Sequence, residues 1–328
     1  MDLVKLENKI ELTGKKDYIN LYRLSEPKQG VLFSHFVIAL ASKRAKRFSS
    51  NYVDAYKTLV YHINRFSDIY EVNIYTNSVN EEFLSDFILY LQGDNLKQGY
   101  IKYLLSLCKA MIRKASSYGF AVDPTFDDID IDNEQSFSIY LSMNDIVRIY
   151  YFKGLTRKQE RIRDLFIVGC LTGLRYSDYS NLDINDIQGD KIIKVTKKTN
   201  KKVYIPIHDY VREILIKYDY DLKFGLCNQH FNRYLKEICK IIGFDEDITY
   251  SYHRGSKLVT ETKKKWELIS SHTARRSAVT NMLQTGRIKP FEIMPITGHT
   301  TEKSLFGYNR ISGEEAINQI AGDSYFRK

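Results

Sequence analysis

Helix-type periodicity in the first third of the chain limits what this sequence can fold into. Within Ser49–Phe66, apolar residues recur at intervals of three and four, while basic residues such as Lys57 lie on the opposite face. The same pattern returns in Asn80–Leu91 and in Lys97–Tyr118. We therefore expect a helical module, built of four helices with basic faces, over residues 31–122.

An acidic stretch that contains a proline, Asp123–Glu134, follows this module and is typical of a linker. A length of 328 residues favours two domains rather than one. We expect an N-terminal segment at 1–30, the helical domain at 31–122, a linker at 123–135, and a second domain with a C-terminal tail at 136–328.

The second domain combines helices with one hairpin. Ser142–Asp145 has the pattern of a capping box, which marks the start of a helix. Lys191–Ile207 alternates apolar and polar residues around a lysine-rich turn, which predicts a β-hairpin. The expected fold class is mainly α with a small antiparallel β-sheet. Further helices are expected at Arg157–Leu171, Asp209–Tyr218, Asn228–Ile242, Thr273–Thr285, Pro290–Thr297 and Glu314–Ile320.

Charge and composition narrow the classes of partner. The formal net charge is +9, with a pI of about 9.1, and this favours a polyanionic partner. No apolar run approaches the ~18 residues that span a bilayer, and the N-terminus has no signal-peptide pattern, so we expect a cytoplasmic protein with no membrane partner. The four cysteines are far apart and include no CxxC pair, so we interpret them as small core residues.

A few polar residues of the second domain have the chemistry that phosphodiester cleavage requires. Arg175 follows the glycine turn Thr172–Gly173, and an arginine grips two phosphate oxygens without losing its proton. His272 begins a helix, and Arg275 lies one turn later on the same face. Further along the chain come His299 and, nine residues after it, Tyr308. Taken alone, Arg175 could be a surface arginine that caps a helix, and Tyr308 is one of 25 tyrosines. The two histidines could suggest a metal site, but neither has a partner at the spacing of metal ligands.

In this order the motifs resemble those of the tyrosine recombinase, or phage integrase, family. Arg175 matches the first arginine of the family, His272 and Arg275 its His-x-x-Arg pair, His299 its later histidine, and Tyr308 its nucleophile. The family lysine lies in a β-hairpin turn. The Lys-Thr pattern favours Lys198 here, with Lys197 as the alternative. The segments around His272 and His299 look most like integrases of Bacteroides-type mobile elements.

The resemblance also implies a fold and a reaction. Residues 31–122 would form a SAM-like core-binding domain, and residues 136–328 an α+β catalytic domain. Tyr308 would form a 3′-phosphotyrosine link with DNA during integration, excision or inversion, while Asp178 would orient the active-site cations. No metal or other cofactor is implied. Segment 1–30 is too short for the complete arm-binding domain that is common in integrases, and we interpret it as a remnant of one.

The implied partners are double-stranded DNA and three further copies of the chain, since tails such as Ser312–Lys328 pack on a neighbouring subunit in this family. Two other functions use related features. A type IB topoisomerase employs much the same groups without a partner duplex. A DNA-binding regulator derived from a recombinase would keep the fold without the reaction. Basic residues that we regard as candidate phosphate contacts are Lys43, Arg44, Lys46, Arg47, Lys57, Lys109 and Arg113.

Overall fold

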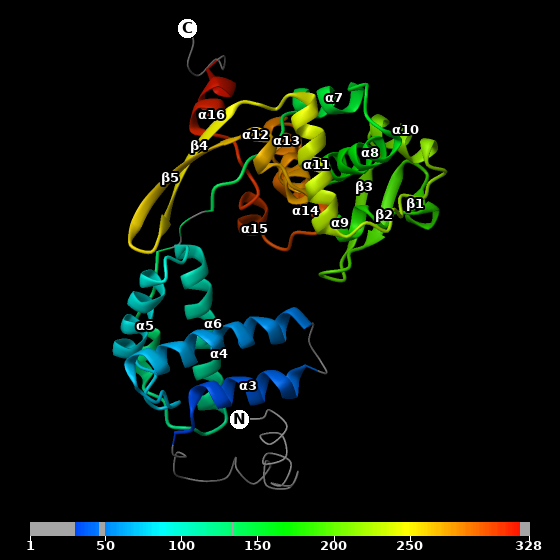
Figure 1. Cartoon of the computed structure of the whole chain (residues 1–328). Helices are drawn as coiled ribbons and strands as arrows, with labels where there is room; N and C mark the ends of the chain where they lie inside the picture. Colours follow the sequence, from blue (N-terminus) through cyan, green and yellow to red (C-terminus); the bar gives the residue numbers. More distant parts are fainter. Residues whose placement is uncertain (1–29, 46–49, 133, 135, 322–328) are drawn as a thin grey trace. The chain divides into compact units, whose positions relative to one another are not determined.

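The computed structural model describes residues 30–45, 50–132, 134 and 136–321, with the backbone alone for residues 50, 51 and 319. All but the last residue of segment 1–30 lies outside this part of the chain. The chain divides into two compact units (Figure 1). Met1–Ser136 and Ser251–Thr260 make up the first unit, and Phe137–Tyr250 and Glu261–Lys328 make up the second.

The first unit is helical, as the periodicity predicts. Its helices in the described residues are α3 (Phe33–Arg44), α4 (Ser50–Tyr70), α5 (Glu81–Gly93) and α6 (Gln98–Ser117). Their apolar faces share one core, in which Phe33, Leu59, Phe87 and Leu104 are fully buried. Asn80 caps α5 by accepting a hydrogen bond from the amide of Phe83.

The basic face of α6 is bound to the chain segment that follows it. That segment contains the short 3-10 helix η2 (Pro124–Asp127), whose Phe126 enters the core. The ammonium group of Lys109 donates hydrogen bonds to the carbonyl oxygens of Asp127, over 3.2 Å, and of Ile129. Arg113 forms an ion pair with Asp127. These two candidate phosphate contacts therefore hold their own unit together.

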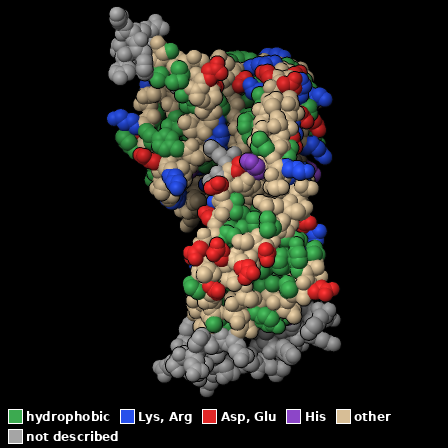
Figure 2. All heavy atoms as spheres, turned by 90° about the vertical axis from the view of Figure 1, so that its left-hand side faces the viewer, with side chains coloured by type: hydrophobic (Ala, Val, Ile, Leu, Met, Phe, Trp, Pro, Cys, Tyr) green, Lys and Arg blue, Asp and Glu red, His purple; other side chains and the backbone are tan. Residues whose placement is uncertain are grey.

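The side of the first unit that carries α5 is partly acidic. Figure 2 shows acidic side chains gathered there beside hydrophobic ones. The first turn of α5 contributes Glu81 and Glu82. These carboxylates give this face a local negative charge, which repels anions.

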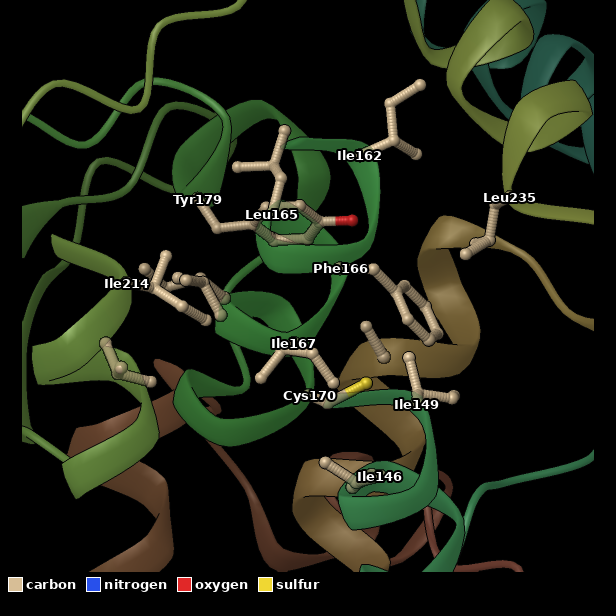
Figure 3. Packing of buried hydrophobic residues seen from close by; sticks show 14 of the residues in the cluster. Ile146, Ile149, Ile162, Leu165, Phe166, Ile167, Cys170, Tyr179, Ile214 and Leu235 are labelled. Carbon is tan, nitrogen blue, oxygen red and sulfur yellow. The ribbon is translucent and has the colours of Figure 1, made fainter. Parts of the chain in front are cut away.

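The second unit is built around one buried helix, α8 (Arg157–Thr172). Figure 3 shows Phe166 and Cys170 of this helix close to Ile149 of α7 and Leu235 of α11. Helices of the unit are α7 (Met143–Tyr151), α8, α9 (Tyr176–Tyr179), η3 (Ile184–Asp186), α10 (Asp209–Lys217), α11 (Asn228–Ile242), α12 (Lys265–Leu268), α13 (Ser271–Gln284), α14 (Pro290–Thr297), α15 (Glu302–Phe306) and α16 (Gly313–Ile320). The expected capping box at Ser142 and Asp145 is present at the start of α7.

The expected hairpin belongs to a three-stranded antiparallel sheet. Its strands are β1 (Ile187–Gln188), β2 (Lys191–Val195) and β3 (Lys202–Pro206), in that order. Ile192 of β2 lies opposite Ile205 of β3, and both are buried. This alternation fixes which face of the hairpin meets the core.

A second sheet corrects the expectation of a single one. Strands β4 (Asp247–Arg254) and β5 (Lys257–Lys264) form a two-stranded hairpin. Its polar residues pair across the strands, as Thr249 does with Thr262 over 2.8 Å. Because most of its side chains are exposed or half-buried, the segment lacks the apolar face that makes a strand visible in a sequence. Mainly α with small antiparallel sheets remains the fold class, and that prediction is confirmed.

Candidate active site

Arg175 is presented by a tight glycine turn at the end of α8. Gly173 has a φ of 68°, in the left-handed region. A Cβ atom there would also lie 3.1 Å from Cγ2 of Thr297 and 3.4 Å from Cβ of Ala278, so glycine is required twice over. Arg175 follows as the N-cap of α9, and its Nη1 atom is buried with no hydrogen-bond partner in the described part of the chain.

Arg275 lies beneath this turn and is 1% exposed. Its Nη1 atom donates to the carbonyl oxygen of Gly173 over 2.7 Å, and its Nη2 atom to that of Thr297 over 2.8 Å. Its Nε atom has no partner within the described residues. Burial, followed by repulsion from Arg175, lowers the pKa of Arg275 to about 10, so the side chain stays charged at neutral pH.

His299 is held by hydrogen bonds at both ring nitrogens. Thr297 donates its one hydroxyl proton to the carbonyl of Ile293 over 2.9 Å, so Nδ1 of His299 must donate to that hydroxyl over 2.8 Å. We therefore assign the proton to Nδ1, which leaves Nε2 to accept from Nη2 of Arg275 over 3.0 Å. Burial, then Arg275 and Arg175, lower the pKa of His299 to about 4.

His272 is the second residue of α13 and is also neutral at pH 7. Although the residue is exposed, desolvation by the surrounding protein comes first among the causes that lower its pKa to about 4, followed by repulsion from Arg276, Arg275, Arg175 and Lys198. A neutral imidazole can accept a proton, as a general base must.

Tyr308 lies among these groups, two residues after α15. Its ring centroid is 4.9 Å from that of His299 and 5.4 Å from that of His272. The Cζ atom of Arg275 lies 5.2 Å from the same ring. The structure thus brings the predicted tyrosine together with both histidines and with the second arginine.

The lysine-rich turn between β2 and β3 is closed by Thr196, whose hydroxyl accepts from the amide of Lys201 over 3.2 Å. Asp178, which is 1% exposed, anchors the turn: its Oδ1 atom accepts from the amide of Lys197 over 2.8 Å. The side chains of Lys197 and Lys198 are exposed. The charge of Lys198 is among the causes that lower the pKa of His272.

Two further arginines near Tyr308 were not singled out from the sequence as site residues. Burial lowers the pKa of both Arg276 and Arg310, and attraction to Tyr308 opposes that shift in each case. Arg276 adjoins the His-x-x-Arg pair, and Arg310 follows the tyrosine by two residues. Their closeness in sequence to Arg275 and Tyr308 is the signal that could have identified them as site residues.

Within the described residues, positive charge at the site is only partly offset, by the buried carboxylate of Asp178, which attracts Arg275. In the described residues, none of Arg175, Arg275, Arg276 and Arg310 has a carboxylate within ion-pair distance. Two buried guanidinium nitrogens also lack hydrogen-bond partners. Buried charges and donors of this kind are costly unless a ligand satisfies them, and an anion with several oxygens would do so.

The remaining candidate phosphate contacts include residues far from Tyr308 in the sequence. Lys57 pairs with Asp54 on the surface, while Lys46 and Arg47 lie outside the described residues.

Over the described ranges, no three His, Cys, Asp or Glu side chains gather as metal ligands do. None of the described helices combines the length and apolar character needed to cross a membrane.

Comparison with known proteins gives the family. The model described as "Phage integrase family" matches residues 140–315, and the "Phage integrase SAM-like domain" matches residues 32–123. No curated protein matches the chain significantly.

Solved structures share the fold at low identity. An integrase of the Tn1549 transposon (residues 82–397), in complex with circular intermediate DNA, is 13% identical, with a TM-score of 0.62 over 88% of this chain and 99% of that one. A lambda integrase (75–356) dimer bound to a COC′ core site is 15% identical, with a TM-score of 0.65 over 85% of this chain and 96% of that one. A lambda integrase tetramer bound to a Holliday junction is 14% identical, with a TM-score of 0.60 over 90% and 86%. The resemblance drawn from the motifs is confirmed: this chain belongs to the phage integrase family.

Proposed function

We propose that this protein is a site-specific tyrosine recombinase that cuts and rejoins DNA through a phosphotyrosine link to Tyr308. One observation carries the proposal. Tyr308 lies against Arg275, at a site where two buried guanidinium nitrogens, of Arg175 and Arg275, lack partners in the described residues. A phosphate beside the tyrosine hydroxyl would satisfy both.

The first step is a transesterification, in which one phosphate ester bond forms as another breaks. The hydroxyl oxygen of Tyr308 bonds to phosphorus, and the bond to the 5′ oxygen breaks. Neutral His272 accepts the phenolic proton, and Lys198 supplies a proton to the leaving oxygen. Arg175 and Arg275 bind the non-bridging oxygens, whose charge grows in the transition state.

The second step reverses the first with a new partner. The 5′-hydroxyl of another strand attacks the phosphotyrosine, and Tyr308 leaves. Because the link conserves the energy of the phosphodiester bond, the residues present can complete both steps without an added energy source. His299 would hydrogen-bond the phosphate, and Asp178 would keep the lysine turn in place.

Duplex DNA is the proposed partner, and four copies of the chain would act together. Support comes from the DNA bound to the Tn1549 and lambda integrases and from the lambda integrase tetramer on a Holliday junction. The net charge of +9 agrees with such a partner. Action in the cytoplasm is part of the same proposal.

The test begins by finding the DNA site. A duplex is selected from a randomised library by binding to Tyr308→Phe, and nicks are then placed at successive positions of the selected duplex. The wild type should form an SDS-resistant adduct at one position and should exchange strands between two duplexes. Failure to form any adduct would refute the proposal, and relaxation of supercoiled DNA with no selected site would favour the topoisomerase alternative.

A further inference from the structure

The segment that carries Tyr308 receives little support from helix propensity or from core packing. The preceding helix α15 has five residues, too few to be stable alone. Its one buried side chain is Leu305, which joins a small cluster with Val279 and Ile293. Tyr308 itself is only half-buried and packs at the edge of that cluster. Something else must fix where its hydroxyl lies.

Thr280, which is fully buried on helix α13, holds the backbone next to Tyr308. Its hydroxyl donates to the carbonyl oxygen of Tyr308 over 3.3 Å and accepts from the amide of Arg310 over 3.2 Å. A hydroxyl has one proton and two lone pairs, so both bonds form at once. One side chain therefore binds the backbone on both sides of Asn309.

Arg310 completes the attachment. Its Nη1 atom donates to the carbonyl oxygens of Gly307, over 2.8 Å, and Asn309, over 2.6 Å. Its Nε atom donates to the hydroxyl of Ser138 over 2.6 Å, at the start of the second unit. The guanidinium group thus joins the tyrosine segment to a chain region about 170 residues away.

The backbone around the nucleophile is consequently saturated with hydrogen bonds. The carbonyl oxygens of residues 307, 308 and 309 all accept from Arg310 or Thr280. The amides of residues 307 to 309 donate to carbonyls of α15, and the amide of Ile311 donates to the side chain of Asn309. A segment bound in this way can rotate very little about the Tyr308 backbone.

We propose that Ser138, Thr280 and Arg310 are positioning residues that hold Tyr308 in line with the phosphate before the first step. The inference rests on the proposed function. Orientation of this kind matters most while the tyrosine is free, because misplacement by about 1 Å can lower a rate ~100-fold. Once Tyr308 is joined to DNA, the covalent bond itself holds it in place. Loss of the clamp should therefore slow cleavage much more than religation.

The experiment measures the two steps separately on the selected duplex. Arg310→Met should reduce the rate of adduct formation by about 10- to 100-fold. Its adduct, accumulated on a nicked duplex and supplied with a 5′-hydroxyl strand, should religate within about 3-fold of the wild-type rate. Arg310→Lys keeps a donor for the Gly307 and Asn309 carbonyls and should cleave faster than Arg310→Met.

Matched variants separate this role from a loss of folding. Arg287→Met is the control, since the guanidinium group of Arg287 makes no hydrogen bond or ion pair within the described residues, and it should behave as wild type. Thr280→Val and Ser138→Ala remove single bonds of the clamp and decide the matter if Arg310→Met does not fold. Thr285→Val is the control for the threonine change, because Thr285 is exposed at the end of the same helix.

Two results would overturn the inference. One is cleavage at the wild-type rate by Arg310→Met and Thr280→Val. The other is an equal loss of cleavage and religation, which would place Arg310 on the phosphate instead. Both differ from failure of the proposed function, in which the wild type itself forms no adduct.

Discussion

Nη2 of Arg275 donates a hydrogen bond to Nε2 of His299 over 3.0 Å. The arginine thus occupies the nitrogen of His299 that the threonine hydroxyl leaves available. A phosphate that binds Arg275 would compete for this donor. It would also favour a proton on Nε2, because a negative charge raises the pKa of an imidazole. When DNA is bound, Nε2 of His299 is therefore expected to change from accepting a hydrogen bond from Arg275 to donating one to the phosphate.

Stability of the second unit should depend on the protonation of His299. The folded pKa is lowered from 6.5 to about 4, so between these values the unfolded chain binds more protons. The free energy of unfolding should thus fall as pH drops from 6.5 to 4, by at most about 1.4 kcal/mol per pH unit from this group. Urea unfolding followed by fluorescence of Trp266, the one tryptophan, reports on this unit. His299→Gln should make the pH dependence shallower, with the remainder coming from His272, whose pKa is lowered in the same way, and an unchanged slope would contradict the assignment.

Arg175→Lys should damage chemistry more than binding. Lysine keeps the charge but loses the planar pair of donors, so the rate of adduct formation should fall about 100- to 1,000-fold. The affinity for the selected duplex should change little, since many other phosphate contacts contribute. Single-turnover cleavage and gel-shift titration measure the two quantities. Full activity of Arg175→Lys would exclude the clamp role.

A change of the leaving group shows which lysine, Lys198 or Lys197, is the general acid. Lys198→Met should slow cleavage of an ordinary duplex, whereas Lys197→Met should have a minor effect. A duplex with sulfur in place of the 5′ bridging oxygen releases a thiolate, which needs no proton from an acid. Lys198→Met should cleave this duplex at nearly the wild-type rate. Rescue of Lys197→Met instead would assign the acid to Lys197.

Lys109→Met should weaken the fold of the first unit rather than its contact with DNA. The ammonium group is bound to two carbonyl oxygens, and loss of such bonds costs about 1–3 kcal/mol. The salt dependence of DNA binding should stay the same, because no phosphate contact is lost. A shallower salt dependence would show that Lys109 binds DNA after all.

Local signals account for what the sequence predicted well. The capping box at Ser142 and the glycine turn before Arg175 act within a few residues, so their spacing alone reveals them. The hydrophobic periodicity of α4 and α6 is equally local. The motif order then gave the family, because it fixes which chemical groups the fold must bring together.

Long-range contacts account for what was missed. Lys109 looks like a surface cation until its partner, about 20 residues away, is seen. The hairpin of β4 and β5 lacks a continuous apolar face. Arg310 acts through Ser138 and Thr280, which no spacing rule connects to it.

Tyr308 is assigned as the nucleophile, and peptide mapping of the trapped adduct identifies the residue that is joined to DNA. Wild-type protein is incubated with the nicked selected duplex, digested with nuclease and protease, and analysed by mass spectrometry. We expect a nucleotide joined through its 3′-phosphate to the peptide that contains Tyr308, and no adduct from Tyr308→Phe. A nucleotide on any other residue, or an undiminished adduct from Tyr308→Phe, would contradict it.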